Sequence, residues 1–195
     1  MTSWRRGRWF VGVGILGLLL GPTPGGAEEA RQRYKRTVHQ FEIPSVTLLS
    51  QDRLQVKLDE FVDSDRPVLV DFIFGTCTTI CPVMSAGYSN LQRKLGEESE
   101  QVRLVSISID PEHDTPEVMK SYLQRYRAKP GWDFLTGSRA DIDKVMRAFD
   151  AYVPDKMSHR PVMFLRAPGE KEWIRIYGLV STRELMEEYR KLLED

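Results

Sequence analysis

The segment PVLVDFIFGTCTTICP occupies residues 67–82 and holds both cysteines of the chain, Cys77 and Cys81. Its first half is a nearly continuous run of apolar, β-branched and aromatic side chains, which predicts a central β-strand covered on both faces. Pro82 then opens a stretch that favours a helix ending at Gly96. The two cysteines are therefore expected where a strand ends and a helix begins, the edge at which open α/β sheets place their functional sites.

The rest of the chain alternates predicted strands and helices. Further strands are expected at 46–56, as two short strands joined by a polar turn, and at 102–109, 161–165 and 173–177. Helices are expected to begin at 114–117, at Ser138 and at 181–184, where N-capping residues stand. A strand-helix-strand core followed by a hairpin and a closing helix predicts the α/β class. We expect a thioredoxin-like sandwich, with a central mixed β-sheet flanked by helices and an N-terminal β-hairpin.

The first 27 residues have the three-part pattern of a secretory signal. Three arginines precede an uncharged run of 12 residues, and small and helix-breaking residues follow it up to Ala27. Because crossing a bilayer takes roughly 20 apolar residues, the run favours a cleaved signal peptide over a membrane anchor. Residues 28–37 are highly charged and are interpreted as a linker, and residues 38–195 as one domain. Export predicts an extracytoplasmic location such as the bacterial periplasm, either soluble or anchored to the inner membrane.

Composition excludes several classes of function. The chain has 195 residues with 28 basic and 28 acidic side chains, so the basic excess that general nucleic-acid binding needs is absent. Two cysteines exclude a multi-bridge secreted scaffold and a four-cysteine zinc or iron–sulfur site within one chain. Any thiol chemistry therefore depends on Cys77 and Cys81.

The spacing of the cysteines allows two kinds of chemistry. At positions i and i+4 in a nearly helical segment the two sulfurs lie on one side, where they can close a disulfide or hold one metal ion. Two thiolates are soft ligands suited to Cu(I) and leave room for another donor. His159, just before the strand expected at 161–165, is the candidate third ligand. Alone, each of these residues also has an ordinary structural explanation, as a buried cysteine or a loop histidine.

Four motifs in order resemble the Sco/SenC family of copper-binding proteins. They are FGTCTTICP at 74–82, VSISIDPEHDTPE at 105–117, WDFLTG at 132–137 and SHRPVMFL at 158–165. The resemblance covers about residues 40–195. It implies a thioredoxin fold with copper as the bound ion, as Cu(I), Cu(II) or both, and a role in assembling the copper centre of cytochrome c oxidase.

The resemblance also implies the site residues. Cys77, Cys81 and His159 become the copper ligands, and Asp110 the acidic residue near the site. Met157 is a candidate neighbour of the metal because its thioether sulfur suits copper. The implied partners are the copper-bearing subunit of an oxidase or another cuproprotein, and other copper chaperones or thiol reductases. Membrane association is expected only through the N-terminus, and no nucleic acid is expected as a partner.

Two other functions compete with a copper metallochaperone, which would not be an enzyme in the strict sense. The first alternative is an extracytoplasmic thiol-disulfide oxidoreductase that uses Cys77 and Cys81 to reduce the cysteines of a copper-site partner. The second is a peroxidase of the peroxiredoxin type. Thr78 and Cys81 fit part of the peroxiredoxin signature, but phenylalanine stands at position 74 where that signature has proline.

Overall fold

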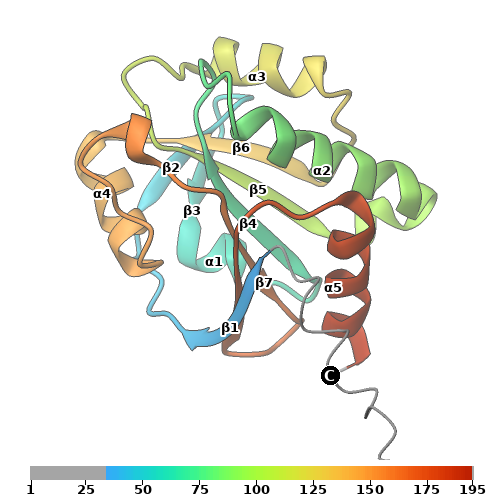
Figure 1. Cartoon of the computed structure of the whole chain (residues 1–195). Coiled ribbons are helices and arrows are strands. Elements are labelled where there is room, and N and C mark those ends of the chain that lie inside the picture. The colour runs from blue at the N-terminus through green and yellow to red at the C-terminus, as the bar shows by residue number, and fades with distance from the viewer. Residues whose placement is uncertain (1–33, 195) are drawn as a thin grey trace, which may run out of the picture. The chain divides into compact units, whose positions relative to one another are not determined.

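The computed structural model describes residues 34–194, which are built around one eight-stranded mixed sheet (Figure 1). The strands are β1 (Lys35–Gln40), β2 (Thr47–Ser50), β3 (Gln55–Lys57), β4 (Val68–Ile73), β5 (Arg103–Ser108), β6 (Trp132–Thr136), β7 (Val162–Arg166) and β8 (Glu172–Tyr177). Their spatial order is β1-β8-β7-β4-β5-β6-β2-β3. The predicted apolar strand is thus β4, in the middle of the sheet.

The pairing of the strands follows from their connections. β4, β5 and β6 are parallel neighbours, because a helix joins each of them to the next. β7 lies antiparallel on the other side of β4, and β8 and β1 continue the sheet outward from it. The hairpin of β2 and β3 forms the opposite edge, next to β6. This confirms the predicted thioredoxin-like α/β sandwich and its N-terminal hairpin.

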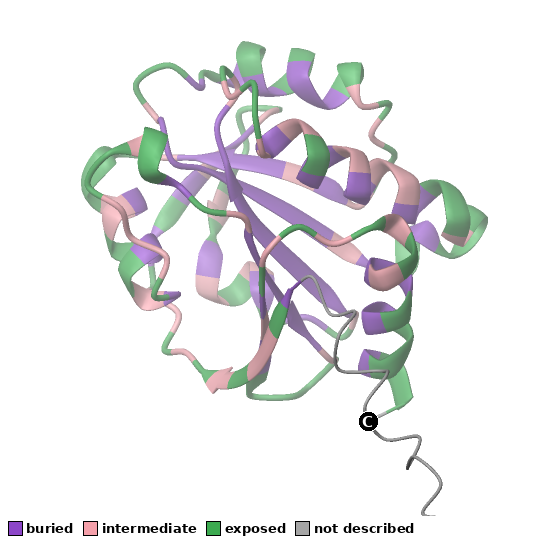
Figure 2. Ribbon diagram, in the orientation of Figure 1, coloured by how far each residue is buried: buried purple, intermediate pink, exposed green. Residues whose placement is uncertain are grey.

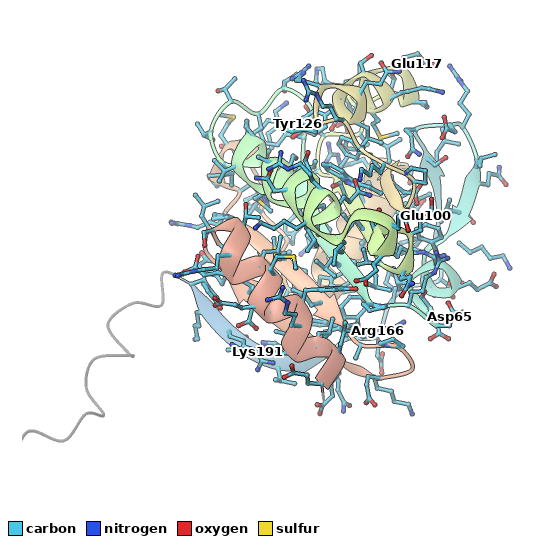
Figure 3. The ribbon with its side chains drawn as sticks, turned by 90° about the vertical axis from the view of Figure 1, so that its right-hand side faces the viewer. Asp65, Glu100, Glu117, Tyr126, Arg166 and Lys191 are labelled. Atoms are coloured by element: carbon cyan, nitrogen blue, oxygen red, sulfur yellow. The ribbon has the colours of Figure 1, made fainter. Side chains whose placement is uncertain are left out.

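Helices cover both faces of the sheet. They are α1 (Leu58–Val62), α2 (Cys81–Leu95), α3 (Pro116–Arg125), α4 (Arg139–Ala148) and α5 (Thr182–Glu194), with 3₁₀ turns η3 (Gly96–Gln101) and η4 (Lys156–Ser158). α2, α3 and α5 lie on one face and α1 and α4 on the other (Figure 1). α2 and α5 lie side by side (Figure 3).

The core has two layers because the central strands are buried on both faces, as Figure 2 shows for β4 and β5. Between the sheet and α4, Phe72, Phe149 and Phe164 pack at centroid separations of 4.8–6.0 Å. On the α2 face, Tyr88 packs edge-on against Trp132 at 5.5 Å. Aromatic packing of this kind holds the sheet between its helices and fixes the position of the end of β4.

The structure corrects the predicted organisation at three points. The last residues of the predicted linker are not linker, because Tyr34 is buried and β1 begins at Lys35. β6 was not predicted as a strand, and neither was the short helix α1. The helix expected to begin at 114–117 is α3, and its N-cap is Thr115, whose side chain accepts the Val118 N–H. The predicted signal segment and residues 28–33 lie outside the described residues.

The remaining predicted elements are confirmed. The strand expected at 102–109 is β5, the hairpin at 161–165 and 173–177 is β7 and β8, and Ser138 caps α4. Within residues 34–194, no helix has both the length and the apolar character needed to cross a membrane.

Candidate metal centre

The two cysteines lie at the junction of β4 and α2. β4 ends at Ile73, the chain bends through residues 74–80, and Cys81 is the first residue of α2. The Cys77 N–H donates to the Phe74 carbonyl at 3.1 Å, which closes the turn. Both cysteines are free thiols; Cys81 is fully buried and Cys77 is half-buried. The predicted strand-to-helix placement of the pair is therefore what the structure shows.

The two thiols differ in acidity. Burial alone would raise the pKa of Cys77, but interactions with the thiol and backbone N–H of Cys81, and with Thr79, outweigh it and leave that pKa below its ordinary value. Burial, followed by the interaction with Cys77, raises the pKa of Cys81 far above its ordinary value. Cys77 is thus the thiol that ionises first, and it is also the one within reach of solvent.

His159 is held against the strand that leads to the cysteines. Its side chain is buried, and Nε2 lies 2.7 Å from the carbonyl oxygen of Phe72 in β4. Because a carbonyl oxygen only accepts, Nε2 carries the proton and donates it, which leaves the lone pair on Nδ1. Burial lowers the pKa of His159, so the imidazole is neutral at pH 7. A neutral ring with one nitrogen unprotonated is the form that binds metals.

The three candidate ligands do not form a closed site. Among residues 34–194, no group of three His, Cys, Asp or Glu side chains is arranged to hold one metal ion. In the structure, the Cys77 thiol interacts with Cys81, and His159 is hydrogen-bonded to Phe72 near the end of β4. The structure does not gather the three donors around one point.

Asp110 follows β5 and is almost fully buried. One oxygen of its carboxylate accepts a hydrogen bond from Lys156 Nζ. The other oxygen lies 3.0 Å from Nδ1 of the exposed His113. Burial would raise the pKa of Asp110, but Lys156 and His113 outweigh it and lower the pKa below the usual range. Asp110 is therefore a charged, paired group. Its partner Lys156 begins the 3₁₀ turn that leads to His159.

Asp114 lies four residues after Asp110, between β5 and α3, and is completely buried. It accepts the N–H of Gly75 at 3.0 Å and 3.2 Å on its two oxygens, and the hydroxyl of Ser108. Burial raises its pKa more than these hydrogen bonds lower it. The sequence offered Asp114 only as part of a helix cap. Its contact with the cysteine segment could not be predicted, since Gly75 is 39 residues away.

Asp71 is a second acidic residue that sequence reasoning missed. It lies in the middle of β4, fully buried, and neither oxygen has a hydrogen-bond partner. Burial raises its pKa to about 7, and the neighbouring Ser106 side chain, on β5, acts weakly in the opposite direction. Its charge would act on Cys81 and Tyr88, which shows that it faces α2. The signal was present in the sequence, since Asp71 is the one charged side chain in the apolar run 67–74.

Met157 lies in η4 with 73% of its surface exposed, so it points to solvent in this structure. Met163, in β7, is buried in the core. A cavity of about 330 Å³ lies beside η4, lined by residues of α4 and of the loop 152–156 together with Ile109. It does not include any of the three candidate ligands.

Comparison with known proteins decides the family. Residues 36–194 match the profile of the SCO1/SenC family, which is more than half of the chain. The chain belongs to the SCO1/SenC family. The SCO1 protein homolog of Bacillus subtilis strain 168 is 36% identical over 150 residues, which make up 73% of this chain and 77% of the homolog.

Solved structures of SCO1/SenC proteins have the same fold. BsSco, described as a member of the Sco family of cytochrome c oxidase assembly proteins with a disulfide switch, is 31% identical with a TM-score of 0.65. The match covers 78% of this chain and 94% of BsSco. ScoI of Arabidopsis thaliana, solved with copper bound, is 27% identical with a TM-score of 0.63, and the match covers 76% of this chain and 95% of ScoI.

Proposed function

We propose that this SCO1/SenC chain is a copper metallochaperone. It binds copper through Cys77, Cys81 and His159 and assists assembly of the copper centre of a cytochrome c oxidase. The proposal rests on the family, on the copper-bound relative and on the chemistry of the donors. Two thiolates and one imidazole are soft to intermediate ligands, the set that favours Cu(I) over Mg²⁺ or Ca²⁺.

The observation that carries the proposal is the hydrogen bond of His159. A metal-ligating histidine ordinarily donates its second ring N–H to a carbonyl or carboxylate, which fixes both tautomer and ring orientation. His159 already makes this bond, from Nε2 to the Phe72 carbonyl, on the strand that leads to the cysteines. Nδ1 is the nitrogen left to bind the metal.

Binding through all three residues requires an adjustment, because the donors are not gathered around one point among the described residues. The segment of residues 76–80 is the part that can adjust. It lies between β4 and α2, outside both elements, and Cys77 in it is half-buried. Cys81 is held because it is the first residue of α2, and His159 is held by its hydrogen bond to β4. We therefore assign the movement on copper binding to Cys77.

The proposed setting is extracytoplasmic, either in the bacterial periplasm or at the inner membrane. The recipient would be the copper-bearing subunit of the oxidase or another cuproprotein, and other copper chaperones or thiol reductases would load or reset the site. Both cysteines must be reduced to bind Cu(I), so oxidation to a disulfide would switch binding off.

Titration of the reduced protein with Cu(I), in competition with a chromophoric chelator, tests the ligand set. The wild type is expected to bind one Cu(I) per chain. Cys77→Ser and Cys81→Ser are expected to abolish competition with the chelator, because each removes a thiolate. His159→Ala is expected to weaken binding by about 10-fold or more, because loss of a ligand costs at least as much as loss of a group that only orients one, which is typically about 10-fold.

His39→Ala serves as the matched control, because His39 lies on the edge strand β1, separated from β4 by β8 and β7, and its ring contacts Thr37 and Phe41. It is expected to leave the stoichiometry and the affinity unchanged. Wild-type affinity in the Cys81→Ser protein would refute the proposed site. An unchanged affinity in the His159→Ala protein would remove His159 from the ligand set.

The second candidate function is thiol-disulfide exchange, favoured by the different acidities of the two thiols. Cys77, with the lowered pKa, would attack a partner's disulfide, forming a mixed disulfide and releasing one partner thiolate. Cys81 would then attack Cys77, releasing the reduced partner and leaving the Cys77–Cys81 disulfide for an extracytoplasmic dithiol reductase to reduce. Reductase activity that depends on Cys77 but is unchanged in His159→Ala would support this function over copper transfer.

A further inference from the structure

One short turn contacts both of the segments that carry the proposed ligands. It runs from Asp110 to Asp114, between β5 and α3, and is closed by two hydrogen bonds of 3.0 Å from the N–H groups of His113 and Asp114 to the Asp110 carbonyl. A third bond, from the Asp110 N–H to Ser108 Oγ at 3.0 Å, ties it to the end of β5. The carboxylates at its two ends are buried and point to different neighbours.

At one end, Asp114 grips the cysteine segment. Both of its oxygens accept the Gly75 N–H, two residues before Cys77. A Cβ atom at position 75 would lie 2.7 Å from Asp114 Oδ1 and 3.1 Å from a methyl group of Val118. The backbone at Gly75 therefore lies directly against the carboxylate, and only a residue without a side chain allows this approach.

At the other end, Asp110 holds the histidine turn through Lys156. The ammonium group of Lys156 binds Asp110 and lies 5.4 Å from the centre of the Phe74 ring. The carbonyl of Lys156 accepts the His159 N–H at 3.2 Å, and the Asp155 side chain accepts the Met157 N–H at 2.9 Å. Asp110 is thus connected to His159 through one ion pair, with Lys156, and one hydrogen-bonded turn.

The ion pair between Asp110 and Lys156 is partly buried, which favours a fixed position for the Lys156 side chain. Asp110 keeps only 5% of its side chain exposed and Lys156 keeps 32%, so the pair is shielded from much of the solvent that weakens surface ion pairs. Lys156 also contacts Phe74, whose carbonyl closes the Cys77 turn. Phe74 and Gly75, where the cysteine segment begins, and Lys156, where the histidine turn begins, are therefore held against the same few atoms.

From this arrangement we propose that the Asp110–Asp114 turn aligns the two halves of the copper site. Lys156, through Asp110, is a positioning residue for His159, and Asp114, through Gly75, is a positioning residue for Cys77. This inference rests on the proposed function, since it concerns the geometry of that site. It assigns roles to Lys156 and Asp114, neither of which is a ligand.

The test is a double-mutant cycle on Cu(I) affinity, measured with the reduced full chain and a competing chelator. Lys156→Met is expected to raise the dissociation constant about 10-fold, the usual effect of removing a group that orients a ligand. In the His159→Ala background the same change is expected to have no further effect, because the residue that it positions is gone. Lys156→Arg, which keeps the cation, is expected to restore most of the affinity.

Gly75→Ala tests the other half of the turn. It is expected to raise the dissociation constant about 10-fold with or without His159, because it displaces the cysteine segment instead. Should Gly75→Ala fail to fold, Asp114→Asn takes its place, since it removes one of the two acceptor oxygens with little change in volume. Lys171→Met, at an exposed lysine between β7 and β8, is the matched control and is expected to bind as the wild type does.

The outcomes separate this inference from the proposed function. If His159→Ala binds Cu(I) like the wild type, the ligand set is wrong and the positioning of His159 by Lys156 falls with it. If His159→Ala binds weakly but Lys156→Met binds normally, the function stands and the role of Lys156 is refuted. Equal losses from Lys156→Met in both backgrounds would also refute it. Wild-type affinity in a folded Gly75→Ala or Asp114→Asn protein would refute the role of Asp114.

Discussion

Asp71→Asn is expected to change how the stability of the domain depends on pH. Asp71 is fully buried in β4, and its oxygens have no hydrogen-bond partner, so ionising it inside the fold is unfavourable. The fold raises its pKa from 3.8 to about 7. The native state therefore binds more protons than the unfolded state between about pH 4 and pH 7. The free energy of unfolding therefore falls as the pH rises through this interval.

The size of the effect follows from the shift. One pKa unit corresponds to about 1.4 kcal/mol, so a rise from 3.8 to about 7 corresponds to about 4 kcal/mol of stability lost by pH 8. Asparagine has nearly the same shape and no charge. Its amide is also buried, which adds a cost of about 1–3 kcal/mol that does not change with pH. The diagnostic quantity is therefore the difference between the two proteins as a function of pH.

Urea unfolding followed by tryptophan fluorescence, under reducing conditions at pH 4 to pH 8, measures this difference. Asp71→Asn is expected to gain about 4 kcal/mol relative to the wild type across that range, mostly between pH 4 and pH 7. Asp65→Asn, at a side chain that is 95% exposed, is the control and is expected to show no such trend. A difference between Asp71→Asn and wild type that stays constant from pH 4 to pH 8 would refute the reasoning.

Two further predictions concern the thiols and a helix cap. Brief treatment of the reduced, metal-free protein with iodoacetamide at pH 7.5 is expected to modify Cys77 at least about 10-fold faster than Cys81, because Cys77 is more acidic and less buried. Peptide mass spectrometry measures the ratio, and equal labelling would contradict it. Ser138→Ala is expected to cost about 1 kcal/mol, because the Ser138 side chain accepts the Asp141 N–H at the start of α4. An unchanged midpoint of urea unfolding would show that this cap contributes nothing.

Much of the fold could be predicted because its signals are local. The apolar run that became β4, the proline and glycine around α2, and the Ser181–Glu184 capping box each specify their own element. The capping box is formed in the structure, with Ser181 N–H on Glu184 at 2.7 Å and Glu184 N–H on Ser181 at 3.3 Å. β1 was missed for the opposite reason. Its sequence, KRTVHQ, is polar, and it becomes a strand by pairing with β8, a partner distant in the sequence.

β6 shows the same limit. Its sequence, WDFLT, is short and carries an acid, and the strand exists because β5 supplies a parallel partner and α3 a crossover. Trp132 Nε1 donates to Ser106 at 3.1 Å, across that pair of strands. Pairing between segments far apart in the chain leaves no periodic signal in either of them.

The sequence by itself determined the chemistry of this protein: two cysteines four residues apart at a strand-to-helix junction, one histidine before a later strand, and four ordered motifs of the SCO1/SenC family. Only the tertiary structure decided how those groups are held. It gave Cys77 the lower pKa, turned Nε2 of His159 toward β4, buried Asp71 without a partner and brought the ends of the Asp110–Asp114 turn against Gly75 and Lys156. The reason is physical. Residue type and spacing set which reactions a side chain can undergo, whereas burial, hydrogen-bond partners and pKa depend on residues that only folding brings near.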